Sequence, residues 1–142
     1  AIASDCMTWH TGRLIDHVHL RARNFLVTRY FYEQVLAALG HRIEQQGKDW
    51  FQIDELFVDA ATARTPPTHV HLAFQARDRE SVDAFHRAAL ISGGTDNGKP
   101  GERDYHPGYY AAFVLDPDGN NIEAVCHGPV RRSAESVRLD PA

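Results

Sequence analysis

The sequence predicts an α+β domain built from two copies of one module, each with a strand, a helix and further strands. The string His-Val-His-Leu occurs at residues 17–20 and again at 69–72, an offset of 52. Repetition of this kind is the sequence signature of duplicated units. The chain has 142 residues, of which 43% are hydrophobic, enough for one compact domain with a core. A further set recurs behind each string at an offset of 54, where Phe31, Leu36 and Gly40 become Phe85, Leu90 and Gly94.

Both strings lie in segments whose apolar and polar residues alternate. Alternation with a period of two is typical of a strand with one buried and one polar face. We therefore expect strands over residues 15–22 and 69–76. The apolar faces consist of Val18, Leu20 and Ala22 in the first strand, and Val70, Leu72, Phe74 and Ala76 in the second. The opposite faces carry His17 and His19 in the first strand, and His69 and His71 in the second.

Each strand is followed by a segment with helical periodicity. The spacing predicts a first helix over residues 25–39, with Asn24 as its N-cap and Gly40 after its end. It predicts a second helix over residues 79–91, with Asp78 as its N-cap and Gly93 after its end. The expected buried stripes are Val27, Phe31, Val35 and Ala38 in the first helix, and Val82, Phe85 and Ala89 in the second.

Weaker strand patterns follow each helix. The first copy is expected to add strands at 41–45 and 50–59, with a turn at 46–49. The second is expected to add strands at 109–115 and 121–126, joined by a turn at 116–120 whose proline and glycine suit tight-turn geometry. Residues 94–108 are rich in glycine and proline, which favours a long loop.

These elements define one domain over residues 14–130, with module one at 14–65 and module two at 66–130. Pro66 and Pro67 form a short stiff link between the modules. Residues 1–13 are an N-terminal segment, and the polar residues 131–142 are expected to form a mobile tail. A module of this order can pair with its copy into one open, curved sheet, with helices outside and a polar hollow inside.

Composition argues against several classes of function. The net charge of −4 gives no electrostatic footprint for nucleic acid. No apolar run approaches the ~20 residues that a membrane helix needs, and no signal-peptide pattern is seen. The two cysteines, Cys6 and Cys126, do not make a disulfide framework. We therefore expect a cytoplasmic protein whose partner is a small molecule rather than nucleic acid or a membrane.

The chain has nine histidines, and four of them lie in the matched strands. Histidine is both the commonest metal ligand and the neutral-pH proton carrier. Glu123 lies mid-strand between apolar residues, where a carboxylate is costly to bury unless it is paired or bound to a metal. Two imidazoles and one carboxylate form a common site for a divalent first-row metal. Two other interpretations stay open: Glu123 faces solvent, or the histidines lie at a surface or hydrogen-bond to each other.

Three motifs carry a resemblance to a known family. They are Ile15-Asp16-His17-Val18, the Phe31-Tyr32 pair in a helix that ends at Leu39-Gly40, and Asp116-Pro117-Asp118-Gly119-Asn120-Asn121-Ile122-Glu123. Together they resemble the vicinal oxygen chelate superfamily, the group of glyoxalases, bleomycin-resistance proteins and extradiol dioxygenases. The resemblance covers about residues 14–125. It implies two paired βαβββ modules in an eight-stranded curved mixed sheet, an open cup with helices outside, and assembly as a homodimer.

The resemblance implies a metal site made of His17, His69 and Glu123. The implied cofactor is one divalent ion, either Zn, Ni, Mn or Fe. Glu123 would also move a proton in the reaction. His19 and His71, which lie one step along each strand, would be alternative ligands, proton carriers or substrate contacts.

The sequence departs from glyoxalase I at the fourth metal ligand, which that enzyme takes from the last strand of its first module. Here the predicted strand 50–59 offers Gln52, Asp54 and Glu55, and none of them matches unambiguously. Without a fourth ligand, a site of two histidines and one carboxylate also suits thiol transferases and iron extradiol dioxygenases of this superfamily.

Substrate contacts are expected from the loop 94–108, because loops on a rigid scaffold commonly carry specificity. The same segment is also compatible with an ordinary long connection. One of Tyr109 and Tyr110 must point into the cup, and alternation alone does not say which. The residues predicted to contact the substrate are Gln52, Arg103, Tyr105, His106 and Tyr110.

The leading functional hypothesis is a metal-dependent enzyme that resembles lactoylglutathione lyase. It would act as a lyase or isomerase on a small oxygenated metabolite that is chelated to the metal. Two alternatives stay open. One is an Fe(II) extradiol-type dioxygenase or a thiol transferase of the same fold, and the other is a non-catalytic, bleomycin-resistance-like protein that binds a small molecule.

Overall fold

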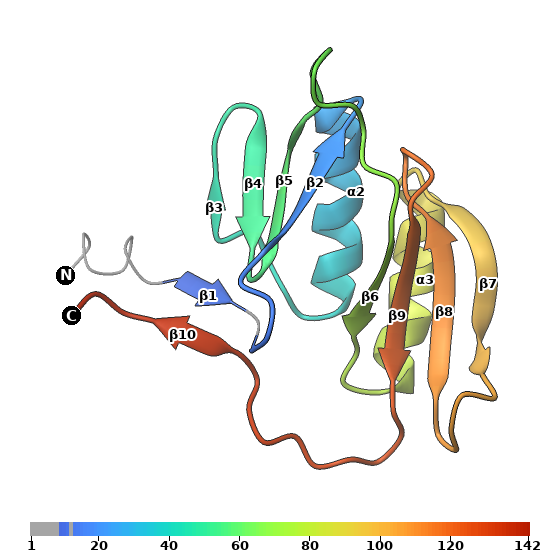
Figure 1. The fold of residues 1–142 in the computed structure, drawn as a ribbon. Coiled ribbons are helices and arrows are strands. Elements are labelled where there is room, and N and C mark those ends of the chain that lie inside the picture. Colours follow the sequence, from blue (N-terminus) through green and yellow to red (C-terminus); the bar gives the residue numbers. More distant parts are fainter. Residues whose placement is uncertain (1–8, 12) are drawn as a thin grey trace.

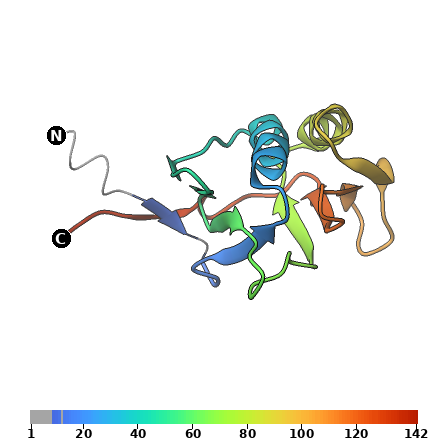
Figure 2. The same cartoon turned by 90° about the horizontal axis from the view of Figure 1, so that it is seen from above.

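The computed structural model describes residues 9–11 and 13–142. Its two repeated modules form two four-stranded mixed sheets, with strand orders β2-β5-β4-β3 and β6-β9-β8-β7. Figure 1 shows the sheets side by side, with the helices α2 (Phe25–Ala38) and α3 (Arg79–Ile91) on one side of them. Viewed from above, both helices again lie on the same side of the strands (Figure 2). The predicted α+β architecture of two modules is therefore confirmed.

The first module places a helix between its first strand and three further strands. Its elements are β2 (Val18–Ala22), α2, β3 (Gln45–Gln46), β4 (Trp50–Ile53) and β5 (Leu56–Ala60). β5 pairs parallel with β2 and antiparallel with β4, and β3 forms the outer edge. The parallel pair requires a crossover, which α2 supplies.

The second module repeats this connectivity. Its elements are β6 (His71–Gln75), α3, β7 (Thr95–Glu102), β8 (Tyr110–Leu115) and β9 (Asn121–Cys126). β9 pairs parallel with β6 and antiparallel with β8, as β5 does with β2 and β4. Both modules are therefore βαβββ units.

The two sheets meet at their inner edges, next to β2 and β6. In the described part of the chain, backbone pairing forms two ladders of four strands rather than one of eight. The connection is made just before β6, where Thr68 N donates to Arg21 O at 3.0 Å and Arg21 N donates to Thr68 Oγ1 at 2.7 Å. Thr68, which precedes β6, thus hydrogen-bonds to the edge of β2 and links the two sheets.

The helices begin at the predicted caps. The side chain of Asn24 accepts a hydrogen bond from Val27 N at 3.4 Å, and Asp78 Oδ1 accepts one from Ser81 N at 2.8 Å. Each cap satisfies a backbone N–H that has no partner inside the helix. α2 ends one residue earlier than predicted, and Gly40 follows it with φ of 91°, a conformation that favours glycine. α3 has the predicted bounds.

The predicted strand 50–59 is wrong, because it is a hairpin of two strands. β4 and β5 pair antiparallel around a turn at Asp54, which has φ of 51°. Phe51 and Ile53 face the core from β4, whereas Leu56 and Val58 face it from β5. In a single strand these two pairs would lie on opposite faces, so the change of parity at residues 54–55 marks the turn.

Other boundaries also differ from the prediction. Residues 95–102, expected to be loop, form β7, whose pairing with β8 contains two register irregularities around Gly98. Such bulges keep a glycine-rich segment in a sheet while increasing its bend. The strand expected at 41–45 is reduced to β3. Part of the predicted tail is β10 (Val137–Leu139), which pairs antiparallel with β1 (Trp9–Thr11).

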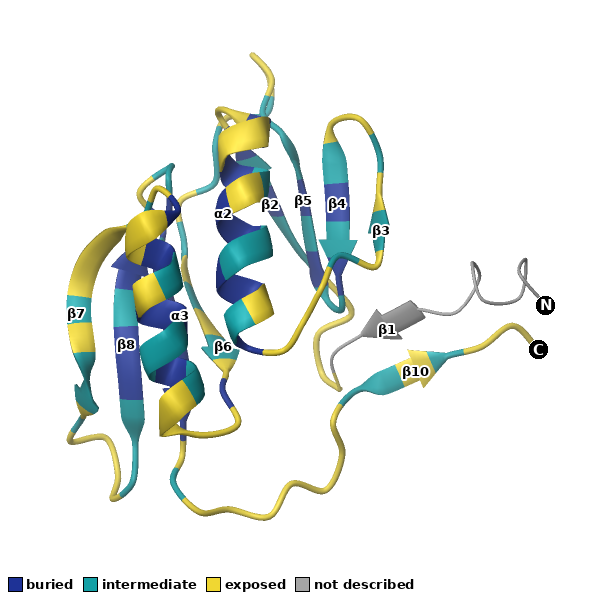
Figure 3. Ribbon diagram, turned by 180° about the vertical axis from the view of Figure 1, so that it is seen from behind, coloured by how far each residue is buried: buried dark blue, intermediate teal, exposed yellow. Residues whose placement is uncertain are grey.

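The core lies between the helices and the sheets, as the buried bands in Figure 3 show. In α2 the buried stripe follows the spacing Phe25, Thr28, Phe31, Tyr32, Val35 and Leu36. Val27, predicted to belong to this stripe, is 44% exposed because it falls beside that series rather than in it. Neither helix among the described residues is long and apolar enough to span a membrane.

A buried polar bond ties the helix of module one to module two. The hydroxyl of Tyr32 donates to Asp116 Oδ2 at 2.6 Å. Asp116 Oδ1 also accepts backbone N–H groups of Asp118 and Asn120, each at 2.9 Å, and so shapes the β8–β9 turn. Burial, followed by the charge of Asp116, raises the pKa of Tyr32 well above its ordinary value. This bond therefore couples α2 to the turn that leads into β9.

We predict that Tyr32→Phe lowers the free energy of unfolding by about 2 kcal/mol, since a hydrogen bond to a charged group contributes roughly 1.5–3 kcal/mol. The matched control is Tyr30→Phe on the same helix, whose side chain is exposed and which should change stability by less than about 0.5 kcal/mol. Urea unfolding followed by circular dichroism measures both variants. Equal effects would contradict the role assigned to the Tyr32 hydroxyl.

Candidate functional site

The face of the second sheet that is turned away from the helices carries a group of polar side chains. On β6, β8 and β9 every second residue packs into the core, for example Leu72, Val114 and Ile122. The residues between them point the other way. Glu123 in β9 lies on this open face, between Ala73 in β6 and Phe113 in β8.

Glu123 is the centre of the candidate site. It is only 2% exposed, and both of its carboxylate oxygens have a partner. Nε2 of His71 donates to Oε1 at 2.9 Å, and the hydroxyl of Tyr109 donates to Oε2. These bonds offset the cost of burying a carboxylate. The His71 side chain itself is 53% exposed, so the site has one buried and one accessible member.

The Tyr109 phenol responds to this setting. Its pKa is raised to about 12, first because burial disfavours the phenolate and then because Glu123 accepts its hydrogen bond and repels a second negative charge. Tyr109 therefore stays protonated at neutral pH and acts as a hydrogen-bond donor. The role of its hydroxyl is to hold a proton at Oε2 of Glu123.

The ring of Tyr109 is surrounded by other aromatic groups. Its centroid lies 4.9 Å from that of Tyr105, and 5.4 Å from those of both His106 and His127. All three contacts are close to edge-to-face, the arrangement that aromatic rings prefer. This cluster extends the site from Glu123 to the surface.

Arg103 lies on a neighbouring part of the open face. Its guanidinium is 5.4 Å from the ring centre of Phe113, and its Nη2 donates to Lys99 O at 2.7 Å. Phe113 also lies 6.0 Å from His71, measured between ring centroids. Arg103 and His71 therefore both lie next to the ring of Phe113.

Tyr110, predicted to contact the substrate, faces the opposite side of the sheet. Its hydroxyl donates to Asp83 Oδ1 in α3 at 2.7 Å, and the guanidinium of Arg79 lies 4.7 Å from its ring centre. Alternation along β8 explains the difference, because neighbouring residues point to opposite faces. Tyr109 is therefore the tyrosine that reaches Glu123.

The polar face of the first sheet has a separate set of contacts. Nδ1 of His17 lies 2.7 Å from Asp16 Oδ1, and both side chains are exposed. Nε2 of His19 lies 2.8 Å from Asp59 Oδ1, and its ring meets the edge of Phe57 at 4.9 Å. Gln52 also lies on this face, and its amide donates to Asp54 O at 3.2 Å.

The predicted metal ligands are not brought together. Among the described residues there is no group of three or more histidine, cysteine, aspartate or glutamate side chains that could hold a metal ion. His17 precedes β2 in the first sheet, and His69 is an exposed residue that precedes β6. The histidine that contacts Glu123 is His71.

The helix caps explain which histidines correspond in the two modules. Asn24 and Asp78 cap equivalent helices and are 54 residues apart. At this offset the counterpart of His17 is His71. The offset of 52 between the two His-Val-His-Leu strings instead pairs His17 with His69. The offset between the two His-Val-His-Leu strings is therefore two residues shorter than the offset between the two modules of the fold.

The strand registers extend this correspondence to the carboxylate. His19 lies opposite Phe57 across β2 and β5, and its counterpart Ala73 lies opposite Glu123 across β6 and β9. Phe57 therefore occupies in module one the place that Glu123 occupies in module two. The first module offers no carboxylate at this position.

Asp54 and Glu55, considered above as fourth ligands, belong to the turn between β4 and β5. Burial raises the pKa of Glu55 to about 7, and a hydrogen bond with Asp54 adds to the shift. Burial also raises the pKa of Asp54. These carboxyl groups interact with each other in the turn, and neither occupies the position that matches Glu123, which is Phe57.

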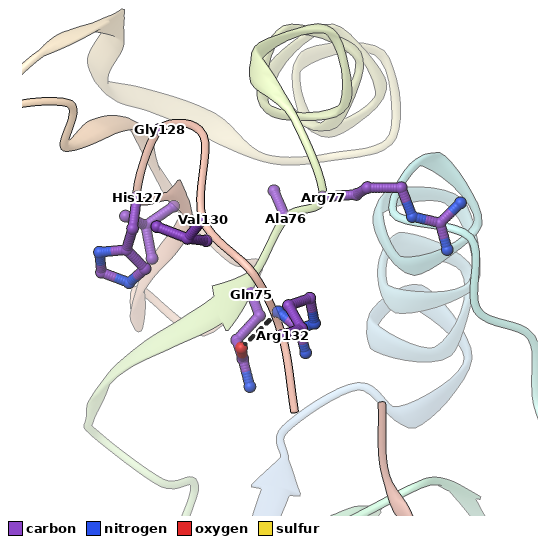
Figure 4. Close-up of a pocket in the computed structure, with 8 residues that line it drawn as sticks. Gln75, Ala76, Arg77, His127, Gly128, Val130 and Arg132 are labelled. Atoms are coloured by element: carbon purple, nitrogen blue, oxygen red, sulfur yellow. Dashed lines mark hydrogen bonds between the residues drawn. The ribbon is translucent and has the colours of Figure 1, made fainter. Parts of the chain in front are cut away.

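Sequence reasoning chose Tyr110 rather than Tyr109 as a site residue and assigned no site role to His127. A signal for His127 was available, because positions 123, 125 and 127 continue one face of β9 beyond its end. His127 also lines a pocket of about 130 Å³ (Figure 4). Gln75 and Val125, which are paired across β6 and β9, line it too.

Comparisons with known proteins agree with this architecture. A family model described as Glyoxalase/Bleomycin resistance protein/Dioxygenase superfamily matches residues 14–124. Among solved structures, a glyoxalase/bleomycin resistance protein from Albidiferax ferrireducens is 31% identical and has a TM-score of 0.70; the match covers 79% of this chain and 98% of that one. A comparison with curated proteins finds no significant match.

Two further solved structures share the fold. A glyoxalase/bleomycin resistance protein/dioxygenase family enzyme from Burkholderia phytofirmans is 22% identical, with a TM-score of 0.58 and coverage of 77% of this chain and 94% of that one. A lactoylglutathione lyase from Agrobacterium tumefaciens is 18% identical, with a TM-score of 0.55 and coverage of 77% and 90%. At these identities the likeness concerns the fold alone.

We predict that Tyr109 titrates near pH 12 in the wild-type protein and at lower pH in Glu123→Gln. The neutral amide removes the charge that opposes a phenolate, whereas burial, the larger cause, keeps the pKa above its ordinary value. The tyrosinate absorbance of each protein is compared with that of the same protein carrying Tyr109→Phe, which isolates this group. An unchanged titration in Glu123→Gln would show that the hydroxyl and the carboxylate do not interact.

Proposed function

Because the chain belongs to the glyoxalase/bleomycin resistance protein/dioxygenase superfamily, we propose that it is a divalent-metal-dependent enzyme of the lyase or isomerase type. Its substrate is a small oxygenated metabolite. The observation that carries this proposal is the buried Glu123 carboxylate, held between the accessible His71 imidazole and the Tyr109 hydroxyl. A buried carboxylate beside an accessible imidazole suits metal binding better than it suits packing.

Imidazole nitrogens and a carboxylate oxygen are donors that suit a divalent ion. The second sheet alone supplies only some of the donors that the ion needs. His71 and Glu123 would provide one nitrogen and one oxygen donor. His17 is the third donor in this proposal, because it is the module-one counterpart of His71. His69, the residue first favoured for the second nitrogen, is the alternative to His71 that the experiment below separates.

A homodimer would bring these donors together. The polar faces of the two sheets in one chain carry His17 and His71 separately, with no group of three donors among the described residues. In a symmetric dimer, the first sheet of one copy can face the second sheet of the other. We therefore propose that the working form is a homodimer with donors from both copies in each site.

The position of Phe57 favours three protein donors over four. A fourth ligand from the last strand of module one would be expected on β5, and the position equivalent to Glu123 is aromatic there. Gln52 lies next to Phe57 across β4 and β5, and its amide already bonds to a backbone carbonyl. The proposed site therefore has two histidines and one carboxylate, which departs from the four-ligand site of glyoxalase I.

The protein's own groups have separate tasks in this proposal. A divalent ion, when bound, would polarise the oxygens of the substrate and stabilise negative charge on them. Glu123 is the group that moves a proton. The Tyr109 hydroxyl donates a hydrogen bond to Oε2 of Glu123 and so holds a proton at that oxygen. Arg103 and Tyr105 lie at the edge of the same face and are the proposed substrate contacts, with His19 contributing from the other sheet.

A second candidate function is the capture of a small molecule without catalysis. The open face of the first sheet carries Trp50 and Phe57 with ring centroids 5.7 Å apart and nearly parallel planes. His19 meets the edge of Phe57 beside them. Such an aromatic platform would bind a flat apolar ligand without any metal.

We predict that chelator-treated protein takes up one Zn²⁺ or Ni²⁺ per chain, measured by calorimetry and elemental analysis. His71→Ala and Glu123→Gln should each weaken binding by more than about 100-fold, beyond the 10–100-fold typical of residues that only orient a ligand. His17→Ala should have a comparable effect. The matched control is His69→Ala, which should leave the affinity within about threefold.

Other outcomes decide between the candidates. A large loss in His69→Ala with none in His71→Ala would return the nitrogen ligand to His69. Failure of the wild-type protein to bind any of Zn²⁺, Ni²⁺, Mn²⁺ or Fe²⁺ would contradict the enzyme proposal and favour the binding module. Metal-loaded protein is then assayed with hemithioacetals of 2-oxoaldehydes, and oxygen uptake with a catechol after Fe(II) loading tests the dioxygenase alternative.

A further inference from the structure

His106 and His127 form a pair of imidazoles at the surface end of the aromatic cluster. Nε2 of His106 lies 2.9 Å from Nδ1 of His127. The ring centroids are 5.1 Å apart, and the planes differ by only 21°. The separation of the centroids exceeds that of the nitrogens by 2.2 Å, which the two ring radii account for. Both nitrogens therefore lie close to the line between the ring centres, as in a hydrogen bond along that line.

This geometry argues against a metal held between the two rings. A shared ion would lie off the line between the nitrogens, and both rings would tilt toward it. The centroids would then be closer together than they are. One proton between the two nitrogens accounts for the arrangement, because only one of two facing ring nitrogens can carry it.

The direction of that hydrogen bond follows from a third contact. Nδ1 of His106 lies 2.9 Å from Pro107 O, and a carbonyl oxygen can only accept. Nδ1 of His106 therefore carries its proton, and in the neutral ring Nε2 is a bare acceptor. His127 must then donate from Nδ1. This leaves Nε2 of neutral His127 without a proton.

Two glycines hold the pair in place. Gly108 and Gly128 have φ of 88° and 84°, and a Cβ on Gly108 would come within 3.1 Å of His127 O. A Cβ on Gly128 would come within 3.3 Å of the Cα of Gly108. Only residues without a side chain allow these backbones to approach so closely. The loop that carries His106 is thereby fixed against the segment that carries His127.

The pair lies beside the candidate site and beside an open space. Tyr109 contacts both imidazoles with its ring and Glu123 with its hydroxyl. Val125 and Gln75 line the pocket with His127, and Val125 is two residues beyond Glu123 on the same face, ~7 Å along the strand. Figure 4 shows the hydrogen bond between Gln75 and Arg132, which line the pocket together with His127. His127 therefore lines this pocket and also contacts Tyr109, whose hydroxyl bonds to Glu123.

We infer that His127 is a proton-transfer group of this site and that His106 is its positioning residue. Resting on the proposed function, the inference adds the acid–base partner of that reaction. Nε2 of His127 takes a proton from a C–H or O–H of the substrate, the bonding electron pair stays on the substrate, and the positive charge spreads over the hydrogen-bonded pair. The imidazolium then returns the proton to the product.

The tautomer is tested in metal-free protein labelled with ¹⁵N-histidine, by long-range ¹H–¹⁵N correlation at a pH where both rings are neutral. The expected result is a protonated Nδ1 and a bare Nε2 in His127. His106→Ala should shift His127 toward the Nε2–H form that free histidine favours. His106→Gln, whose Oε1 still accepts at the same place, should keep the Nδ1–H form, and His69→Ala is the control without effect.

Turnover of the metal-loaded enzyme supplies the second readout. His127→Ala should lower kcat about 100-fold or more, in the range of a lost acid–base group, while metal affinity and KM stay within threefold. His106→Ala should lower kcat about tenfold, and His106→Gln should restore most of it. Unchanged kcat in His127→Ala would overturn the proton-transfer role even with the expected tautomer.

The two proposals fail in different ways. Loss of metal binding in the wild type would remove the proposed function but leave the tautomer result readable. A His127 that carries its proton on Nε2 in the wild type would overturn the inference about the pair, whatever metal the protein binds. An unchanged His127 spectrum in His106→Ala would overturn it as well.

Discussion

The burial of one carboxylate, that of Glu123, is the constraint on which the second module's open face depends. At 2% exposure it has almost no water, so polar groups of the protein must replace hydration. β9 is the strand that pairs with both β6 and β8, and the two partners come from either side of it. His71 begins β6, and Tyr109 directly precedes β8. The need to satisfy one charge thus fixes an imidazole and a phenol on the same face.

The two modules show that equal backbones can carry different chemistry. Helix caps, strand pairing and crossover agree between them, yet Phe57 stands where Glu123 would be expected by symmetry. In module one the carboxylate on this face is that of Asp59, two residues after Phe57 in β5. It contacts His19, whereas Glu123 contacts His71. The aromatic ring leaves the first sheet suited to contact an organic ligand, and the second sheet suited to polar chemistry.

Local signals made the helices predictable, whereas the site depended on pairings that the sequence does not display. Asn24 and Asp78 are caps in the structure because each supplies an oxygen next to unsatisfied N–H groups. The turn at Asp54 was missed although the parity of the apolar residues changes there. His69 was preferred to His71 because of the family resemblance, whereas the helix caps, which are 54 residues apart, make His71 the counterpart of His17. Tyr109 could not be joined to Glu123 without the register of β8 and β9, whereas the alternation along β9 already places His127 on the face of Glu123.

The proposed site has two separate parts, the buried Glu123 carboxylate and the exposed pair of His106 and His127. Glu123 is shielded from water and is bonded at both oxygens, so its carboxylate keeps a fixed place. His106 and His127 are exposed, so in the proposed reaction they would exchange protons with water. Tyr109 stands between the two, but its hydroxyl bonds only toward Glu123 and only its ring faces the imidazoles. The tyrosine therefore lies between the carboxylate and the imidazole pair, and in the proposed reaction the bound substrate would be the group that connects them.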